Sequence, residues 1–235
     1  MSTRQSARHG TTDDLSNKMR SYMAEIYRLV DRQPESAAYT STSQLADLLF
    51  VSPPAVNRMV NKLAELGLLH HEPYQGIAIT EKGKTVALKH IRHQRIAEAF
   101  LVNIMEISWL HVYDEAQRLS RGLSETVTQR MYQMAGKPAV CPHGEPIPDA
   151  RGRIPSVADE FLFGVGAGSR VRISRLITRE FDRLQYIEAL GLVPDQVCEV
   201  IHVAPFNGPM QLRLNREYRI IGDSLARLIR VERLD

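Results

Sequence analysis

The chain has 235 residues and a formal net charge of +3, so it is long enough for two domains but has no overall excess of basic residues that would by itself indicate nucleic-acid binding. Its two cysteines are too few for a disulfide framework, so we expect a cytoplasmic protein with reduced thiols. No apolar run approaches the ~20 residues that a membrane-spanning helix needs, and no membrane partner is expected. Residues 1–14 are polar and are predicted to form a mobile tail.

The first folded part of the chain is predicted to contain three helices and a hairpin. Apolar residues recur at helical spacing over residues 15–32. A short helix, a tight turn, a second helix over residues 54–66 and a hairpin over residues 69–79 follow in that order. Ser52 precedes two prolines and is predicted to cap the second helix with its hydroxyl. This order is typical of a winged helix-turn-helix, which places its second helix in the DNA major groove.

The outward face of that second helix carries side chains suited to DNA. Arg58 has the geometry for a bidentate pair with guanine, and Ala55 is suited to a thymine methyl group. The alternative is an ordinary solvated helix face, but the preceding helix and the following hairpin favour DNA binding. The predicted DNA-contacting residues are Ser43, Ser52, Pro54, Ala55, Asn57, Arg58, Asn61, Lys62 and, near the tip of the hairpin, Tyr74.

Three helices are predicted after the hairpin, with Thr80, Ser108 and Ser124 as their N-terminal caps. Two of these helices carry wide apolar faces. We expect a second copy of the chain to cover them; the alternative is burial against the C-terminal region. A basic run on the first of these helices, which includes Arg92 and Arg95, is predicted to be a solvated helix face.

The C-terminal part changes in character. Residues 141–168 are rich in proline and glycine and are predicted to form a connector, in which Asp159 and Glu160 are expected to be solvated. Several short strands around one small helix that begins near Phe181 then predict a compact barrel.

Motifs for catalysis are missing from the sequence. It has no Gly-x-Ser-x-Gly elbow, no phosphate-binding glycine loop with lysine and no His-Glu-x-x-His pair, so an enzyme is not expected. Cys141 and His143 are metal donors two residues apart, but two donors are too few for a structural zinc site. We therefore predict that they belong to a rigid turn.

Six motifs occur in order along the chain. They are Ile26-Tyr27, Ser52-Pro53-Pro54, Thr80-x-x-Gly83, Arg95-Ile96-Ala97-Glu98, Asp114-Glu115-Ala116 and Gly144-x-Pro146-Ile147-Pro148. Together they resemble the diphtheria toxin repressor family of iron- and manganese-dependent regulators. The resemblance spans nearly the whole chain and implies a dimeric repressor that binds palindromic operators and ends in an SH3-like barrel like that of ferrous-iron transport accessory proteins. The predicted fold class is α+β, with a mobile tail at 1–14, a winged helix-turn-helix domain at 15–80, a helical dimerisation domain at 81–140, a connector at 141–168 and the SH3-like (FeoA-type) β-barrel at 169–235.

The resemblance also implies that most of the family's metal donors are replaced. Non-donors or poor donors stand at the expected positions, namely Ser21, Ala24, Gln94, Tyr113, Gln117, Ser120, Arg121 and, in the barrel, Arg183. Glu98 and Glu180 are the remaining candidate ligands. Since first-row divalent ions need imidazole, carboxylate or thiolate donors, no cofactor is expected. Arg121 is predicted to replace the charge of the ion by pairing with Glu98 or Glu115; the alternative is a surface cation.

The sequence thus predicts a cytoplasmic, homodimeric transcription regulator, a repressor by resemblance, that binds double-stranded operator DNA without metal. One alternative is a regulator that depends on Mn²⁺ or Fe²⁺ through relocated ligands. Another is a protein-interaction module whose barrel binds an unidentified ligand or peptide while the winged domain only dimerises.

Overall fold

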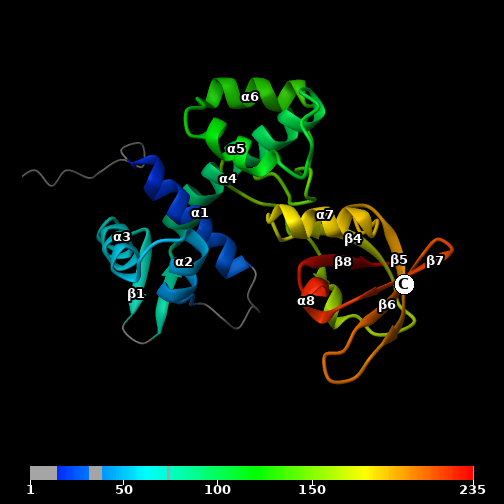
Figure 1. Cartoon of the computed structure of the whole chain (residues 1–235). Coiled ribbons are helices and arrows are strands. Elements are labelled where there is room, and N and C mark those ends of the chain that lie inside the picture. Colours follow the sequence, from blue (N-terminus) through cyan, green and yellow to red (C-terminus); the bar gives the residue numbers. More distant parts are fainter. Residues whose placement is uncertain (1–14, 32–38, 73–74, 235) are drawn as a thin grey trace, which may run out of the picture. The chain divides into compact units, whose positions relative to one another are not determined.

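The computed structural model describes residues 15–31, 39–72 and 75–234 (Figure 1). The predicted tail at 1–14 and Tyr74 lie outside these ranges. The chain divides into two compact units, Met1–Arg92 with Pro148–Arg153, and His93–Ile147 with Ile154–Asp235. Among the described residues, no helix combines the length and the apolarity that crossing a membrane requires.

The first unit has the winged helix-turn-helix arrangement that the sequence predicts (Figure 1). The hairpin is antiparallel, and Thr40 adds a bridge to its second strand through two backbone hydrogen bonds with Ile77, at 2.9 and 2.8 Å. Side chains from the helices and the hairpin are buried together, including Ile26, Leu45 and Leu63. The elements are α1 (Asn17–Asp31), α2 (Thr42–Leu49), α3 (Pro53–Glu65), β1 (Leu69–Glu72), β2 (Gly76–Ile79) and the first part of α4 (Glu81–Asn103).

The start of α3 corrects one prediction. Ser52 has the extended backbone of an N-cap residue, but its hydroxyl makes no capping hydrogen bond. The reason is local: Pro53 and Pro54 have no N–H to donate, and the N–H of Ala55 bonds to the backbone carbonyl of Ser52 at 2.9 Å. The hydroxyl of Ser52 is therefore left on an exposed residue at the N-terminal end of α3.

The start of α4 fits the prediction. The hydroxyl of Thr80 accepts a hydrogen bond from the N–H of Gly83 at 3.0 Å. The same hydroxyl donates to the carbonyl of Leu68 at 3.0 Å, which connects the helix to the base of the hairpin. A Cβ atom at Gly83 would lie 2.0 Å from that carbonyl oxygen, so the close approach requires glycine.

In the second unit, the remainder of α4 packs with α5 (Val112–Ser120) and α6 (Glu125–Met134) around a small apolar core. Ser124 caps α6 as predicted, because its hydroxyl accepts from the N–H of Val127. The prediction that Ser108 caps the next helix was wrong, because α5 begins at Val112. Ser108 lies in the preceding turn, and its backbone carbonyl accepts a hydrogen bond from the N–H of His111.

Several large apolar side chains of this helical part remain exposed. Val127 and Met134 lie two turns apart on α6, so both belong to one face of that helix. Leu119 on α5, and Ile104 and Met105 just after α4, are exposed as well. These faces are therefore not covered within the described part of the chain.

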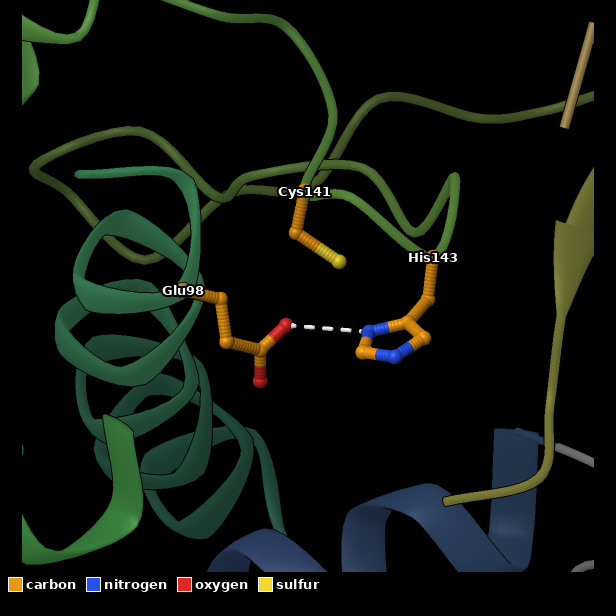
Figure 2. Close-up of side chains that lie close together, drawn as sticks. All are labelled: Glu98, Cys141 and His143. Carbon is orange, nitrogen blue, oxygen red and sulfur yellow. Dashed lines mark hydrogen bonds and ion pairs between the residues drawn. The ribbon is translucent and has the colours of Figure 1, made fainter. Parts of the chain in front are cut away.

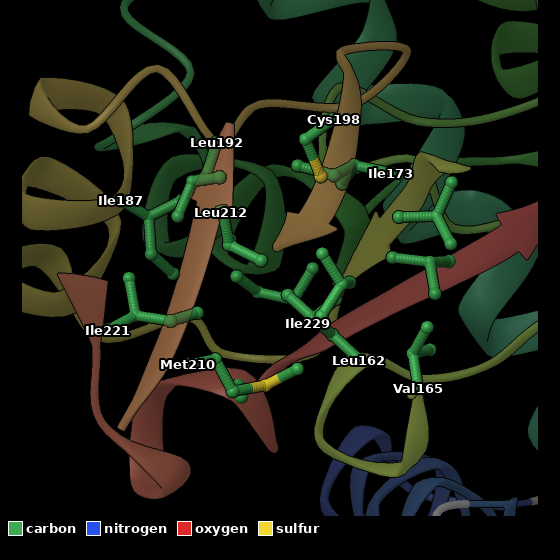
Figure 3. Packing of buried hydrophobic residues seen from close by; sticks show 14 of the residues in the cluster. Leu162, Val165, Ile173, Ile187, Leu192, Cys198, Met210, Leu212, Ile221 and Ile229 are labelled. Carbon is green, nitrogen blue, oxygen red and sulfur yellow. The ribbon is translucent and has the colours of Figure 1, made fainter. Parts of the chain in front are cut away.

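The C-terminal part forms a six-stranded antiparallel sheet in the order β3-β8-β4-β5-β6-β7, which curls around an apolar core (Figure 3). Its elements are β3 (Glu160–Phe161), the short 3₁₀ helix η2 (Leu162–Gly164), β4 (Arg170–Leu176), α7 (Phe181–Ala189), β5 (Val197–Val203), β6 (Met210–Leu214), β7 (Glu217–Ile221), α8 (Asp223–Ala226) and β8 (Ile229–Arg233). The sheet begins inside the predicted connector, since β3 spans Glu160–Phe161. Leu162 and Val165, also in that segment, are buried in the barrel core.

Asp159 in that segment is not solvated as predicted. Its side chain is fully buried and accepts hydrogen bonds from Arg175 at 2.8 Å and from Arg230 at 2.6 Å. Ser174 donates a further bond at 2.8 Å. Burial acts to raise the pKa of this carboxyl, but the bonds and charge of Arg175, together with the bonds from Ser174 and Arg230, lower it overall. Asp159 thus holds the start of the barrel against β4 and β8.

Candidate metal centre and nucleic-acid interface

Three metal donors meet in the second unit (Figure 2). Glu98 lies on α4, and Cys141 and His143 lie on the loop that follows α6. One ligand atom from each lies within 4.8 Å of the other two, and each residue is 3% exposed. The Nδ1 atom of His143 is 3.4 Å from a carboxylate oxygen of Glu98. The carboxylate, the thiol and the imidazole therefore converge on one buried point.

The loop with Cys141 and His143 is held from two sides. Within the loop, the N–H of Cys141 donates to the carbonyl of Glu145 at 2.9 Å, and the N–H of Gly144 donates back to Cys141 at 2.8 Å. On the barrel side, the N–H of Leu176 donates to the carbonyl of His143 at 2.9 Å. Gly144 has a φ of +83°, and a Cβ atom there would lie 2.1 Å from a backbone oxygen of β4. The loop conformation therefore requires glycine at this position.

Buried arginines support the same loop, which corrects the prediction of a solvated basic face. Arg95 is 2% exposed; it donates to the carbonyl of Pro146 at 2.6 Å and pairs with Glu145 at 2.7 Å. Arg179 also reaches Glu145, at 3.3 Å. Arg92, in the first unit, is likewise buried and donates to a backbone carbonyl. The sequence pattern showed the charges but not the carbonyl and carboxylate groups that satisfy them.

Electrostatics differ between the donors. Burial raises the pKa of Glu98, but the hydrogen bond and charge of His143, then the charge of Arg179 and a bond from Cys141, lower it overall. Glu98 is therefore a carboxylate near neutral pH. Burial, followed by the charges of Glu98 and Glu145, raises the pKa of Cys141 well above its usual range. A thiolate at Cys141 therefore needs a compensating positive charge.

The chemistry of this donor set fits a divalent transition-metal ion. Imidazole, carboxylate and thiolate are the protein ligands that such ions prefer. The second ring nitrogen of His143 is buried, and it has no hydrogen-bond partner among the described residues. The ring of Trp109 lies 5.6 Å from that of His143 and covers the imidazole on one side. A bound ion would supply the positive charge that the Cys141 thiolate requires.

Two of the positions that the sequence singled out for the usual metal sites are occupied by other interactions. Glu180, one of the two remaining candidate ligands, is exposed and pairs with Arg183 at 2.9 Å. The ring of Tyr113 packs under the guanidinium of Arg179, 4.5 Å from its centroid. The only predicted candidate ligand in the cluster is therefore Glu98.

Arg121 is exposed at the C-terminal cap of α5, whereas Glu98 is buried and hydrogen-bonded to His143. Glu115, the other partner predicted for it, pairs with Arg118 at 2.6 Å. The role of Arg121 as a substitute for an ion stays a prediction.

An open cavity of about 820 Å³ lies beside the metal-donor loop. Cys141 and Trp109 line one part of it, and Arg172 and Glu188 line the part that belongs to the barrel. The indole N–H of Trp109 donates to Glu188 at 2.6 Å. A ligand at the barrel, which the sequence left open, has room at this place.

The second candidate site is the outward face of α3. Asn57, Arg58 and Lys62 are exposed there, as are Ser52 and Pro54 at its N-terminal end, while Ala55 is half-buried. Asn61 is exposed, and its Oδ1 accepts a hydrogen bond from Nδ1 of His71 on β1 at 3.0 Å. Ser43 on α2 is exposed and bonds to the hydroxyl of Ser41 at 3.0 Å. The described residues predicted to contact DNA thus lie on α2, at the start of α3 and along α3.

A winged helix-turn-helix, a helical segment with a buried cluster of metal donors and an SH3-like barrel together define a DNA-binding transcription regulator. Comparisons with known proteins agree. Residues 14–77 match the iron-dependent repressor N-terminal DNA-binding domain, residues 80–149 match the iron-dependent repressor metal-binding and dimerisation domain, and residues 164–233 match the FeoA domain. The chain belongs to the diphtheria toxin repressor family of transcription regulators.

Relatives match nearly the whole length or a part of the chain. The iron-dependent repressor IdeR of Mycobacterium tuberculosis is 26% identical over 234 residues, which span 94% of this chain and 100% of that protein. The regulator MntR of Listeria welshimeri is 32% identical over 106 residues, 45% of this chain and 71% of that protein. A manganese-dependent transcriptional repressor in complex with manganese has a similar structure, with a TM-score of 0.85, 27% identity and coverage of 92% of this chain and 100% of that one.

These findings correct the prediction that the protein needs no cofactor. The matched domain is a metal-binding domain, and the similar structure is that of a manganese complex. The prediction was wrong because Cys141 and His143 provide two other donors next to Glu98. The sequence shows this pair, but two donors alone are too few for a structural zinc site, and the third donor lies on a distant helix.

Proposed function

We propose that this protein is a metal-activated repressor that binds operator DNA as a homodimer, with a first-row divalent ion held by Glu98, Cys141 and His143. The observation that carries the proposal is the buried convergence of these three donors in a chain of this family. Fe²⁺ and Mn²⁺ are the two ions that we propose as activators in the cell. The thiolate favours Fe²⁺ over Mn²⁺ in intrinsic affinity, because Mn²⁺ prefers oxygen donors.

The donors couple the ion to the fold of the second unit. Glu98 lies on α4, which also contributes to the helical core. Arg95, one turn earlier on the same helix, holds the loop through its ion pair with Glu145. His143 is bonded through its carbonyl to β4. Binding at this point therefore connects α4, the loop and the barrel, and it favours the arrangement in which all three keep these contacts.

For DNA, we propose that α3 enters the major groove. Arg58 is suited to a base edge, and Ser52, Asn57 and Lys62 to base edges or phosphates. Tyr74, predicted near the tip of the hairpin, is proposed to lie beside the backbone of the DNA. Asn61 is proposed to contact DNA while bonded to His71, which fixes its orientation.

For the dimer, we propose that the exposed apolar side chains of α5 and α6 face a second copy of the chain. Val127 and Met134 on one face of α6, with Leu119 on α5, are the central residues of that surface. A two-fold dimer presents two copies of α3, so the operator should be palindromic with half-sites about one helical turn apart, or a multiple of it. A ligand or peptide at the barrel remains a further prediction.

A direct test uses the chelated, full-length protein. An operator duplex is selected from random DNA in the presence of Fe²⁺ or Mn²⁺, and its affinity is then measured with and without the ion. Because Trp109 is the only tryptophan and lies 5.6 Å from the His143 ring, its fluorescence should report ion binding at the centre. We expect one ion per chain, tighter DNA binding with the ion, and an affinity that falls steeply as salt rises.

Three outcomes would refute parts of the proposal. DNA binding of equal strength in chelator and in metal would remove the activation by metal. Ion binding without any DNA affinity at low salt would favour the interaction-module alternative. A monomer by sedimentation at the concentrations that saturate the operator would remove the paired half-sites.

A further inference from the structure

Phe50 occupies the turn between α2 and α3 in an unusual conformation. It follows directly after α2, with φ of 52° and ψ of 44°, in the left-handed region. Its backbone N–H closes α2 by donating to the carbonyls of Ala46 and Asp47. Its side chain is 95% exposed. The residue therefore ends the helix with its backbone and projects the whole aromatic ring into solvent.

Neither capping nor packing explains a phenylalanine here. The left-handed conformation is strained for a bulky side chain, whereas glycine and asparagine adopt it readily. An exposed ring contributes no burial to the fold, and it adds an apolar surface to a turn that is otherwise suited to polar residues. The strained residue should therefore be sought among those with a function.

The position of Phe50 suggests that function. Ser52, Pro53 and Pro54, the exposed residues at the N-terminal end of α3, follow Phe50 within four positions. Asn57 and Arg58 continue the same exposed run one turn further along α3. In a helix-turn-helix, the residues at the start of the second helix are those that contact base edges. Phe50 thus extends the proposed DNA-contacting surface with its one large apolar group.

We propose that the ring of Phe50 contacts the 5-methyl group of a thymine in each half-site of the operator. This inference rests on the proposed function and adds a specificity-determining residue to it. Apolar contact is the way in which proteins distinguish the thymine methyl group in the major groove. The ring is already exposed in the protein without DNA, so no rearrangement is needed to present it.

The chain offers a matched control in its second unit. Phe206 is 98% exposed and has a φ of 58°, so it is a second phenylalanine that combines a positive φ with an exposed side chain. It lies in the turn between β5 and β6, where Asn207 also has a positive φ, at 55°. Replacing either phenylalanine by asparagine relieves the same kind of backbone strain. Only Phe50 belongs to the helix-turn-helix.

The experiment compares Phe50→Asn and Phe206→Asn with the wild type, all loaded with metal and tested on the selected operator. Both variants should unfold at a higher temperature than the wild type, because asparagine tolerates the left-handed conformation. Only Phe50→Asn should bind the operator more weakly. Replacing one thymine of each half-site by uracil removes its methyl group and should weaken wild-type binding about fourfold per contact, the effect of burying one such group. The same replacement should not affect Phe50→Asn.

Each contrary result is decisive. If Phe50→Asn binds the operator as the wild type does, or remains equally sensitive to uracil, the contact with thymine does not exist. If Phe50→Asn lowers the unfolding temperature, the ring supports the fold instead of the DNA contact; Phe50→Gly repeats that comparison with no side chain. If the wild type selects no duplex at all, the proposed function fails first. That result is distinct from a variant that matches a DNA-binding wild type.

Discussion

Replacing Cys141 by serine tests the metal centre with the smallest change in shape. The substitution exchanges a sulfur for an oxygen at a site that is 3% exposed. The buried thiol of the metal-free protein, whose pKa is raised well above its usual range, is neutral, and so is the serine hydroxyl. The metal-free variant should therefore fold as the wild type does, while the ion loses its one sulfur ligand.

The expected loss follows from the number of donors. Zinc sites with four protein ligands bind with about 10–16 kcal/mol, which is about 2.5–4 kcal/mol per ligand. Three protein donors converge here, so removing one thiolate should weaken Zn²⁺ or Co²⁺ binding by about 10²–10³-fold. Mn²⁺ should lose about tenfold or less, because it gains little from sulfur and tolerates oxygen donors. The variant should thus change selectivity as well as affinity.

The assay is a titration of Trp109 fluorescence with each ion, supported by the sulfur-to-cobalt charge-transfer absorption of the Co²⁺ form. Cys198→Ser is the matched control, since the chain has two cysteines. Cys198 lies on β5 in the barrel core, where burial raises its pKa to about 11. That variant should lose stability but keep its metal affinity.

A Cys141→Ser protein that binds Zn²⁺ and Co²⁺ within twofold of the wild type would show that Cys141 is not a ligand. A charge-transfer band that survives in Cys141→Ser and disappears in Cys198→Ser would show that Cys198, and not Cys141, is the sulfur ligand. Equal losses for Mn²⁺ and Zn²⁺ would show that the substitution disturbs the loop and not the ligand.

Further predictions concern the fold and the DNA contact. Asp159→Asn should lower the free energy of unfolding by about 3–5 kcal/mol in urea titrations, because Arg175 and Arg230 lose their buried carboxylate. Since the folded protein lowers the pKa of Asp159, its contribution is full above about pH 4 and is lost as the pH falls below it, so stability should fall less with acid in the variant. Arg58→Ala should cost about 1–3 kcal/mol of operator binding and relax the preference at one base, whereas equal loss on every sequence would indicate a phosphate contact. Gly144→Ala should weaken ion binding in the Trp109 titration, because its Cβ atom would lie 2.1 Å from a carbonyl oxygen of β4 and displace the loop; unchanged affinity would show that the loop shifts without cost.

Local patterns predicted most of the elements. The apolar stripe of α3, the prolines at its start and Gly67, whose φ of 70° ends it, all act over a few residues and could be seen in the sequence. The same holds for the cap at Thr80, whose hydroxyl accepts from the N–H of Gly83. Such features depend on the backbone near the residue itself, so they need no knowledge of the tertiary fold.

The metal centre and the buried acid depend on distant partners. Glu98 and His143 are separated by 45 positions in the sequence, and Asp159 and Arg230 by 71. Periodicity carries no information about which helix face meets which loop, so each residue was judged alone. A lone Cys-x-His pair suggested a turn, and an acid in a proline-rich stretch suggested solvation. Only the folded chain supplies the third donor and the two guanidinium groups.

The carbonyl of His143 accepts a hydrogen bond from the N–H of Leu176 on β4, while the imidazole of the same residue faces Glu98. One amino acid thereby joins strand β4 of the barrel to the proposed metal centre. A protein shortened before β4 would keep all three donors but lose the strand that orients one of them, so its metal affinity should drop even though no ligand is missing. On the proposed function, the C-terminal third of the chain would then set the metal concentration at which the protein binds its operator.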